Sequence, residues 1–164
     1  MSSSTPGRSQ VEKLKVNEQK WSKLLIDAGW TALPNVIIER QAAFGLDALD
    51  INLIVHLAHY WWQPENLPHP SVETIAKALQ VTPRTIQKRM RRLEAAGLMN
   101  RQERRTTKNG SATNLYRFDG LIAAAKPYAE EKLKEIEAAT KAKTERLARK
   151  KPKLVVNNDG GGVG

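Results

Sequence analysis

Five cationic side chains lie within nine residues, between Arg84 and Arg92, and Thr85 and Gln87 are interspersed among them. Lysine and arginine donate charge-assisted hydrogen bonds to phosphate, an arginine fork can read guanine, and glutamine can read adenine. A charge run is often only a solvated helix face. Here no acidic residue interrupts the run, so local ion pairs do not explain it, and a face built for solubility usually mixes signs. The run therefore favours a polyanionic partner.

The net charge of +10 is concentrated in one part of the chain. Residues 84–117 hold ten lysines and arginines against only Glu94 and Glu103, a net charge of +8. The first 70 residues carry a net charge of −1. Such focusing is typical of an electrostatic footprint for phosphates.

Two short helices are expected to position these cations. Ser71 can cap the first helix, whose apolar face is Val72, Ile75, Ala76 and Leu79. Thr82 and Pro83 mark the start of the second helix, and Val81 and Ile86 can form a hydrophobic staple across it. The inward positions of the second helix are Ile86, Met90, Leu93 and Gly97. This periodicity leaves six side chains facing outward: Arg84, Thr85, Gln87, Lys88, Arg91 and Arg92.

A basic β-hairpin is predicted after Gly97, which suits the left-handed end of a helix. Two strand-like runs, LMNRQERR and NLYRF, flank the turn signal Asn109-Gly110. The predicted tip carries Arg104, Arg105 and Lys108. A basic hairpin beside a helix-turn-helix is typical of a wing.

The 25-residue run IAKALQVTPRTIQKRMRRLEAAGLM resembles the core of bacterial winged helix-turn-helix proteins, including MarR-like regulators. It is more similar to the helix-turn-helix domain of phage and plasmid replication proteins and mobile-element regulators. In that family a His69-Pro70-Ser71 start, VTPRTIQ, EAAGL, and TNLYRF followed by GLI recur together. The resemblance covers about residues 47–125 and implies a mainly α fold with a small two-stranded β-hairpin wing. It is specific for the fold, but the same module serves repressors, activators and initiators.

The sequence departs from this family at two positions. Gln80 stands where the family most often has glycine, so we expect a left-handed penalty or a remodelled turn. Arg89 replaces a commonly apolar residue of the second helix. We expect Arg89 at the helix edge, with its stem packed and its charge free.

The domain layout follows from the remaining patterns. We expect a disordered N-terminus (1–10), a helical arm (11–46), the winged domain (47–118), a long C-terminal helix (119–150) and a flexible tail (151–164). Within the arm, one helix is predicted over Val11–Ala28, ended by Gly29, and another over residues 35–44. Asp47 and Asp50 open the first helix of the winged domain, whose predicted buried face is Ile51, Ile54, Val55, Ala58 and Trp62. Trp61 and Trp62 are expected to contribute core and edge packing.

The predicted C-terminal helix, capped by Asp119, carries a loose seven-residue repeat formed by Ile122, Ala129, Leu133, Ile136, Thr140 and Leu147. We favour a homodimerisation helix, because reading a palindromic site normally needs a two-fold partner. The alternative is a helix packed on its own domain at its start and solvated further out. In the tail, Lys150, Lys151 and Lys153 are available for loose phosphate contacts.

Other classes of function find little support. The chain has no cysteine and no apolar run long enough to span a bilayer, and its polar first residues, MSSSTPGRSQ, lead us to expect no signal segment. It lacks a glycine-rich phosphate loop, an HExxH pair and a GxSxG elbow. His56 and His59 have no third ligand at matching spacing. We therefore expect no enzyme, cofactor, metal or membrane role, and a cytoplasmic, nucleoid-associated protein of a bacterium, phage or plasmid.

The resulting hypothesis is a sequence-specific protein for double-stranded DNA, most simply a transcriptional regulator. The second helix would enter the major groove with Arg84, Thr85, Gln87, Lys88 and Arg91. The phosphates would be contacted mainly by Arg92, Arg104, Arg105, Lys108 and Arg117, and the tip of the wing would enter the minor groove. Two alternatives remain open. One is a plasmid or phage replication initiator or accessory protein that binds origin repeats and recruits a protein partner through the N-terminal arm or the C-terminal helix; the other is a protein–protein adaptor.

Overall fold

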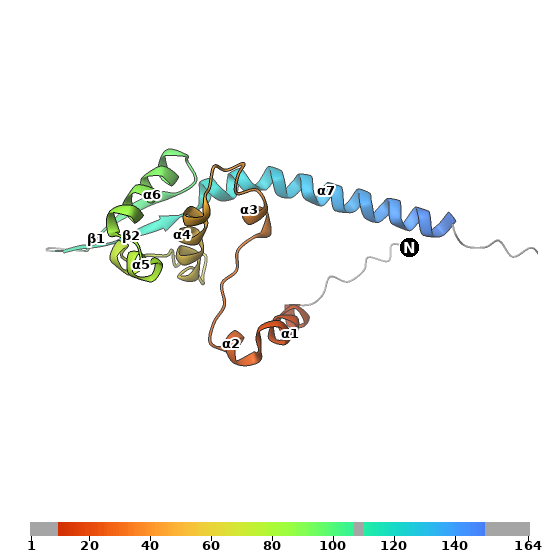
Figure 1. Ribbon diagram of the computed structural model, residues 1–164, viewed down its shortest axis with the longest axis horizontal. Coiled ribbons are helices and arrows are strands. Elements are labelled where there is room, and N and C mark those ends of the chain that lie inside the picture. Colours follow the sequence, from red (N-terminus) through yellow and green to blue (C-terminus); the bar gives the residue numbers. More distant parts are fainter. Residues whose placement is uncertain (1–9, 107–109, 150–164) are drawn as a thin grey trace, which may run out of the picture. The chain divides into compact units, whose positions relative to one another are not determined.

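The computed structural model describes residues 10–106 and 110–149 (Figure 1). Three helices, α1 (Gln10–Trp21), α2 (Lys23–Asp27) and α3 (Asn35–Glu39), precede α4 (Ala48–His59). The pair α5 (Val72–Leu79) and α6 (Pro83–Ala95) leads into strands β1 (Asn100–Thr106) and β2 (Gly110–Arg117), followed by α7 (Asp119–Arg149). This order confirms the expected mainly α fold with a two-stranded wing. The expected N-terminal disorder, the Asn109-Gly110 turn and the flexible tail fall largely or wholly outside the described residues.

The chain divides into two compact units, Met1–Ala125 and Lys126–Gly164. The core of the first unit is built where α4, α5 and α6 meet the hairpin. Its most deeply buried side chains include Leu53, Leu57, Ile75, Ile86, Met90 and Tyr116. The arm adds Ile37 and Leu46 to this core, and the first turns of α7 add Leu121 and Ala125.

Helix α4 begins as expected but buries a different face. Asp47 accepts hydrogen bonds from the backbone N–H groups of Leu49 and Asp50, and the Asp50 carboxylate accepts one from Asp47 N–H. The predicted buried face was wrong in part: besides Ile54, the fully buried positions are Asp50, Leu53 and Leu57, whereas Trp62 is exposed. The helix is apolar nearly all round, so its periodicity does not single out one face.

The α5–α6 turn is fixed by caps at both helix starts. Ser71 Oγ accepts from Thr74 N–H at 3.0 Å, and Thr82 Oγ1 accepts from Thr85 N–H at 3.2 Å. Between them, Gln80 ends α5 with φ 54° and ψ 40°. The turn therefore keeps the left-handed geometry that glycine usually provides, with the steric cost expected for glutamine.

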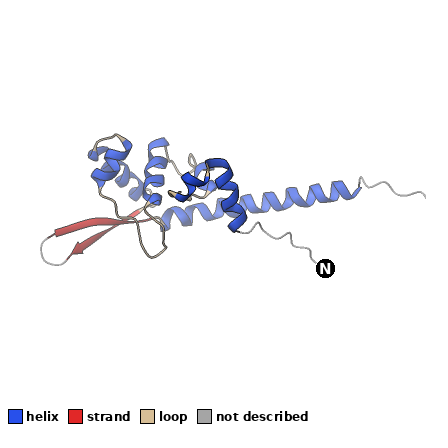
Figure 2. Cartoon of the chain, turned by 90° about the horizontal axis from the view of Figure 1, so that it is seen from below, coloured by secondary structure: helices blue, strands red, loops and turns tan. Residues whose placement is uncertain are grey.

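Strands β1 and β2 form one antiparallel hairpin, drawn in red in Figure 2. Their register changes between the pairs Gln102–Leu115 and Arg104–Ala112. Two residues of β2, Thr113 and Asn114, therefore face Glu103 alone, which is a β-bulge. Tyr116 N–H donates to Pro68 O at 2.9 Å, so β2 is also tied to the loop before α5.

The start of α7 lies directly against the turn that ends α6. Leu121 N–H donates to Leu98 O at 3.0 Å, and Gly97 has φ +70°. Gly120 comes so close to this turn that a Cβ on it would lie 1.8 Å from Gly97 O. Asp119 is the first helical residue.

The N-terminal arm contains a break that the sequence pattern did not predict. The expected single helix over Val11–Ala28 is interrupted at Ser22, which has φ 76° and caps α2 through its hydroxyl group. Gly29, with φ 123°, ends α2 as expected. The exposed rings of Trp30 and Trp62 meet edge to face, with their centroids 6.5 Å apart, and the Trp61 ring packs on Phe118.

The second unit consists, where described, of the continuation of α7. Leu133, Ile136 and Leu147 are exposed there. Pro127 lies inside the helix, where it removes one backbone N–H donor. Within the described part of the chain, no helix combines the length and apolarity required to cross a membrane.

Candidate nucleic-acid interface

The outer face of α6 carries a row of cations. Arg84, Lys88 and Arg91 are spaced four and three residues apart, so they project from one side of the helix, and all are exposed. Within the described residues, no hydrogen bond or close ion pair holds Arg84 or Lys88, whereas the charge of Arg91 interacts with that of Glu94, three residues later. Gln87 is exposed next to this row. Thr85 lies at its other edge, half buried, with its hydroxyl group 2.9 Å from that of Thr82.

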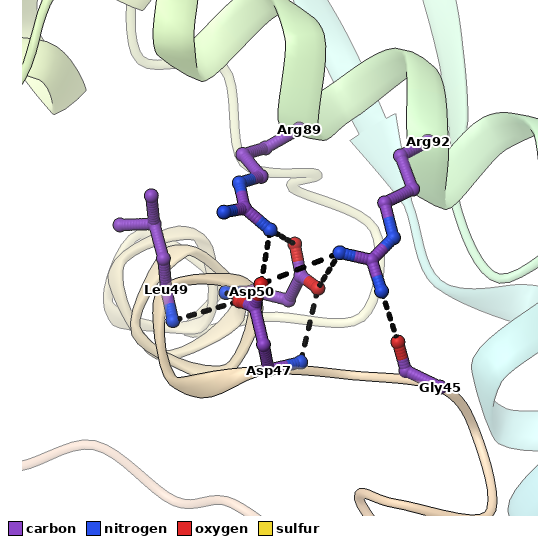
Figure 3. Close-up of polar contacts among 6 residues, drawn as sticks. All are labelled: Gly45, Asp47, Leu49, Asp50, Arg89 and Arg92. Carbon is purple, nitrogen blue, oxygen red and sulfur yellow. Dashed lines mark hydrogen bonds and ion pairs between the residues drawn. The ribbon is translucent and has the colours of Figure 1, made fainter.

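Arg89 and Arg92 leave the same helix in another direction, toward the start of α4 (Figure 3). Arg89 Nη1 donates to Asp47 Oδ2 and lies 3.5 Å from Asp50 Oδ1. Arg92 Nη1 is 3.3 Å from Asp47 Oδ2 and 3.2 Å from Asp50 Oδ2, and its Nη2 donates to Gly45 O at 2.5 Å. We call Asp47, Asp50, Arg89 and Arg92 the α4–α6 ion cluster.

The electrostatics of the α4–α6 ion cluster depend on a buried carboxylate. Asp50 is completely buried, and such a charge is tolerated only when ion partners and hydrogen bonds compensate its desolvation. The pKa of Asp47 falls to about 2, first because Asp50 N–H donates to it and also because Arg89 does. The hydrogen bond to Asp47 raises the pKa of Arg89. Asp47 and Arg89 therefore stay charged at neutral pH.

The structure corrects one expectation about Arg89. Its stem is packed as predicted, since the side chain is 25% exposed, but its charge is not free. The acidic partners stand 39 and 42 residues earlier in the chain, beyond the reach of any local pairing rule. A signal was nevertheless present: Asp50 falls three residues before Leu53 and seven before Leu57, on the buried stripe of α4, and Arg89 occupies a commonly apolar position.

The wing contributes fewer unpaired cations than its composition indicates. Arg101 Nε and Nη2 donate to the two Glu94 oxygens at 2.8 and 2.6 Å, which lowers the pKa of Glu94. Arg117 Nε donates to Asp119 Oδ2 at 2.7 Å. Arg104 is exposed on β1. The side chain of Arg105, Lys108 and the tail lysines Lys150, Lys151 and Lys153 lie outside the described residues.

A groove of about 620 Å³ lies between the wing and the start of α5, with Gln87 of α6 at its edge. Its lining includes Gln87 of α6, Thr113 and Asn114 at the β-bulge, and Arg104. Glu73 and Glu103 also line it. The two carboxylates make the groove less attractive to a phosphate than the exposed cation row on α6. Among the described residues, no group of three or more histidine, aspartate or glutamate side chains could hold a metal ion.

Comparison with known proteins supports the helix-turn-helix assignment. Residues 45–99 match the family model of a helix-turn-helix domain, which confirms the expected resemblance over that stretch. A comparison with curated proteins found no match.

Two solved structures with similarity to this chain are a possible transcriptional regulator from Methanosarcina mazei and a multiple antibiotic-resistance repressor (MarR) from Listeria monocytogenes. The first is 16% identical with a TM-score of 0.38, over 63% of this chain and 85% of that one. The second is 17% identical with a TM-score of 0.35, over 88% of this chain and 100% of that one. Likenesses at this level carry no functional argument.

Proposed function

We propose that this protein binds double-stranded DNA in a sequence-specific manner and acts as a transcriptional regulator. The observation that carries the proposal is the exposed row of Arg84, Lys88 and Arg91 on the second helix of a helix-turn-helix. The major groove is about 12 Å wide and admits one α-helix, whose cations can then reach guanine edges and flanking phosphates.

The side chains of α6 would divide the work by position. Arg84 and Thr85 in the first turn would approach base edges, together with Gln87, whose amide can pair with adenine. Lys88 and Arg91 would contact bases or phosphates further along the helix. On the wing, Arg104, Arg105, Lys108 and Arg117 would contact phosphates, with the tip reaching the minor groove.

Alanine substitution at Arg84 tests the proposal most directly. If Arg84 reads a base, Arg84→Ala lowers affinity for the specific duplex by ~1–3 kcal/mol and affinity for a scrambled duplex by much less. Fluorescence anisotropy at near-physiological salt measures both affinities. Lys141→Ala is the control, because it removes one exposed cation from α7. Equal losses on both duplexes would contradict base reading by Arg84.

The specific duplex comes from selection of bound sequences out of a random pool. A regulator working as a dimer would select an inverted repeat with half-sites ~10 base pairs apart. A set of direct repeats would favour the alternative, a replication initiator or accessory protein. A pool without any enrichment would contradict sequence-specific binding and leave the adaptor hypothesis.

A homodimer formed through α7 is the assembly we propose. Leu133, Ile136 and Leu147 are exposed at the expected repeat positions. Thr140, which interrupts the repeat, donates its hydroxyl group to Ile136 O at 2.8 Å. Its polar group is thus satisfied within the helix, which makes Thr140 more tolerable in an apolar seam.

The dimer is tested by analytical ultracentrifugation of the whole protein. Ile136→Lys places a charge in the proposed seam and is expected to give a monomer. Lys141→Glu is a control in which a surface charge changes outside the repeat. A wild-type protein that sediments as a monomer at the concentrations needed for DNA binding would overturn the dimer proposal.

A further inference from the structure

The five cations of α6 form two groups with different partners. Arg84, Lys88 and Arg91 make up the outer row, in which, among the described residues, Arg84 and Lys88 have no acidic partner and Arg91 interacts with Glu94. Residues 85, 89 and 92 have the same four-and-three spacing, one position further along the chain. They therefore form a second row, rotated by about 100° toward α4. Both cations of this second row belong to the α4–α6 ion cluster.

The partners of Arg92 hold its guanidinium from two directions. One nitrogen lies between the carboxylates of Asp47 and Asp50, and the other donates to the Gly45 carbonyl oxygen. A cleft of about 400 Å³ beside these groups is lined by Asp47, Thr85, Lys88, Arg89 and Arg92. Half of the Arg92 side chain is still exposed there, so a phosphate has physical access to it.

Moving Arg92 onto a phosphate would weaken the compensation of a buried charge. Asp50 is completely buried, and each guanidinium that leaves its carboxylate leaves a desolvated anion with fewer partners. A phosphate contact at the exposed end of the same side chain would be screened by solvent and salt. The balance therefore favours the existing ion pairs.

We propose that Asp47 and Asp50 withhold Arg89 and Arg92 from the DNA phosphates and so limit the sequence-independent part of the affinity. The inference rests on the proposed DNA-binding function, and it replaces the expectation of a phosphate contact for Arg92. Phosphate contacts strengthen binding to every sequence, whereas base contacts discriminate. Two additional cations at the edge of the major-groove helix would raise non-specific affinity. The carboxylates keep that affinity low and hold the helix against α4.

The experiment compares salt dependence in two matched variants of the whole protein. Arg92→Gln and Lys88→Gln each remove one cation from an exposed side chain of α6, and glutamine has a helix propensity close to that of both residues. Anisotropy titrations on a scrambled duplex at several salt concentrations give the slope of log affinity against log salt. We expect Lys88→Gln to reduce the slope by ~0.9, the value for one phosphate contact, and Arg92→Gln to leave it unchanged.

A third variant tests the carboxylates themselves. Asp47→Asn removes one charge from the α4–α6 ion cluster but keeps a residue that caps helices equally well. We expect it to steepen the slope and to raise scrambled-duplex affinity by up to ~8-fold at 0.1 M salt, the effect of one added phosphate contact. Affinity for the selected duplex rises no more than this, so the specificity ratio does not improve. Circular dichroism melts confirm that all variants are folded at the assay temperature.

Either of two outcomes overturns the inference while leaving the proposed function intact. One is an Arg92→Gln protein whose slope falls by ~0.9, the loss of one phosphate contact. The other is a folded Asp47→Asn protein with the wild-type slope and scrambled-duplex affinity. A wild-type protein that binds no duplex at all refutes the proposed function and, with it, the inference.

Discussion

Replacing Gly120 by alanine is expected to destabilise the protein, although helix propensity predicts the opposite. In a helix, alanine is normally favoured over glycine by roughly 0.5–1 kcal/mol. Here a Cβ would lie 1.8 Å from Gly97 O and 2.9 Å from Gly97 C. Both are backbone atoms, so no flexible side chain can move aside.

The size of the effect follows from the contact. Ordinary van der Waals contact begins at 3.4 Å, so the two segments must separate by about 1.6 Å, the difference from 1.8 Å. That separation breaks the 3.0 Å hydrogen bond from Leu121 N–H to Leu98 O, worth about 0.5–1.5 kcal/mol. Overpacking of this kind typically costs about 1–3 kcal/mol. After the helix-propensity gain of alanine is subtracted, the expected loss is roughly 1–4 kcal/mol, a large part of the stability of a small domain.

Urea unfolding followed by circular dichroism measures this loss. Gly97→Ala is the matched control: its Cβ would meet nothing within 4 Å, but its φ of +70° imposes a left-handed strain of about 1–2 kcal/mol. We expect Gly120→Ala to unfold at lower urea than Gly97→Ala. A Gly120→Ala protein as stable as the wild type would refute the close approach of α7 to the α6–β1 turn.

Three further predictions concern stability. Gln80→Gly relieves the left-handed strain at φ 54° and should raise the unfolding free energy by roughly 1 kcal/mol, seen as a higher urea midpoint. In the folded protein the pKa of Asp47 is about 2, against an ordinary 3.8, first because Asp50 N–H donates to its carboxylate and then because Arg89 does. Because unfolding returns this pKa to its ordinary value, the ionised carboxylate stabilises the fold above about pH 4, and this stabilisation is lost as the pH falls toward 2. Asp47→Asn should therefore lose less stability than the wild type across that window, and parallel curves would contradict the ion cluster. Leu57→Ala should lower the free energy of unfolding by about 2–5 kcal/mol in thermal or urea unfolding, because Leu57 is completely buried. A loss below about 0.5 kcal/mol, as at an exposed site, would favour the buried face of α4 that the sequence predicted.

The helix-turn-helix was predictable because its signals are local. Ser71 and Thr82 cap the helices they precede, and the strongly one-sided apolar pattern of α6 places Ile86, Met90 and Leu93 inside. Each of these choices depends on residues within one or two turns, so a sequence pattern captures it.

The errors arose where structure depends on distant residues or on an ambiguous pattern. The buried face of α4 is set by what packs on it, since the helix is apolar nearly all round. The break at Ser22 carries no glycine or proline signal. No acidic residue lies inside the α6 run, but the carboxylates that pair with Arg89 come from the start of α4.

The candidate site was predicted in part. The exposure of Arg84, Lys88 and Arg91 followed from helical period alone. Which cations are already paired did not follow, because that depends on tertiary neighbours such as Gly45 and Asp50. DNA contacts by any of these residues remain predictions.

The α4–α6 ion cluster also limits how α6 can be transplanted into another protein. A graft of the helix-turn-helix alone, residues 71–97, would separate Arg89 and Arg92 from their carboxylates and from the Gly45 carbonyl oxygen. It would also lose the contact from Leu121 to Leu98 that lies beyond the wing. The smallest portable module therefore begins before Gly45 and ends after Leu121, and designers who exchange only α6 would need to exchange the start of α4 with it.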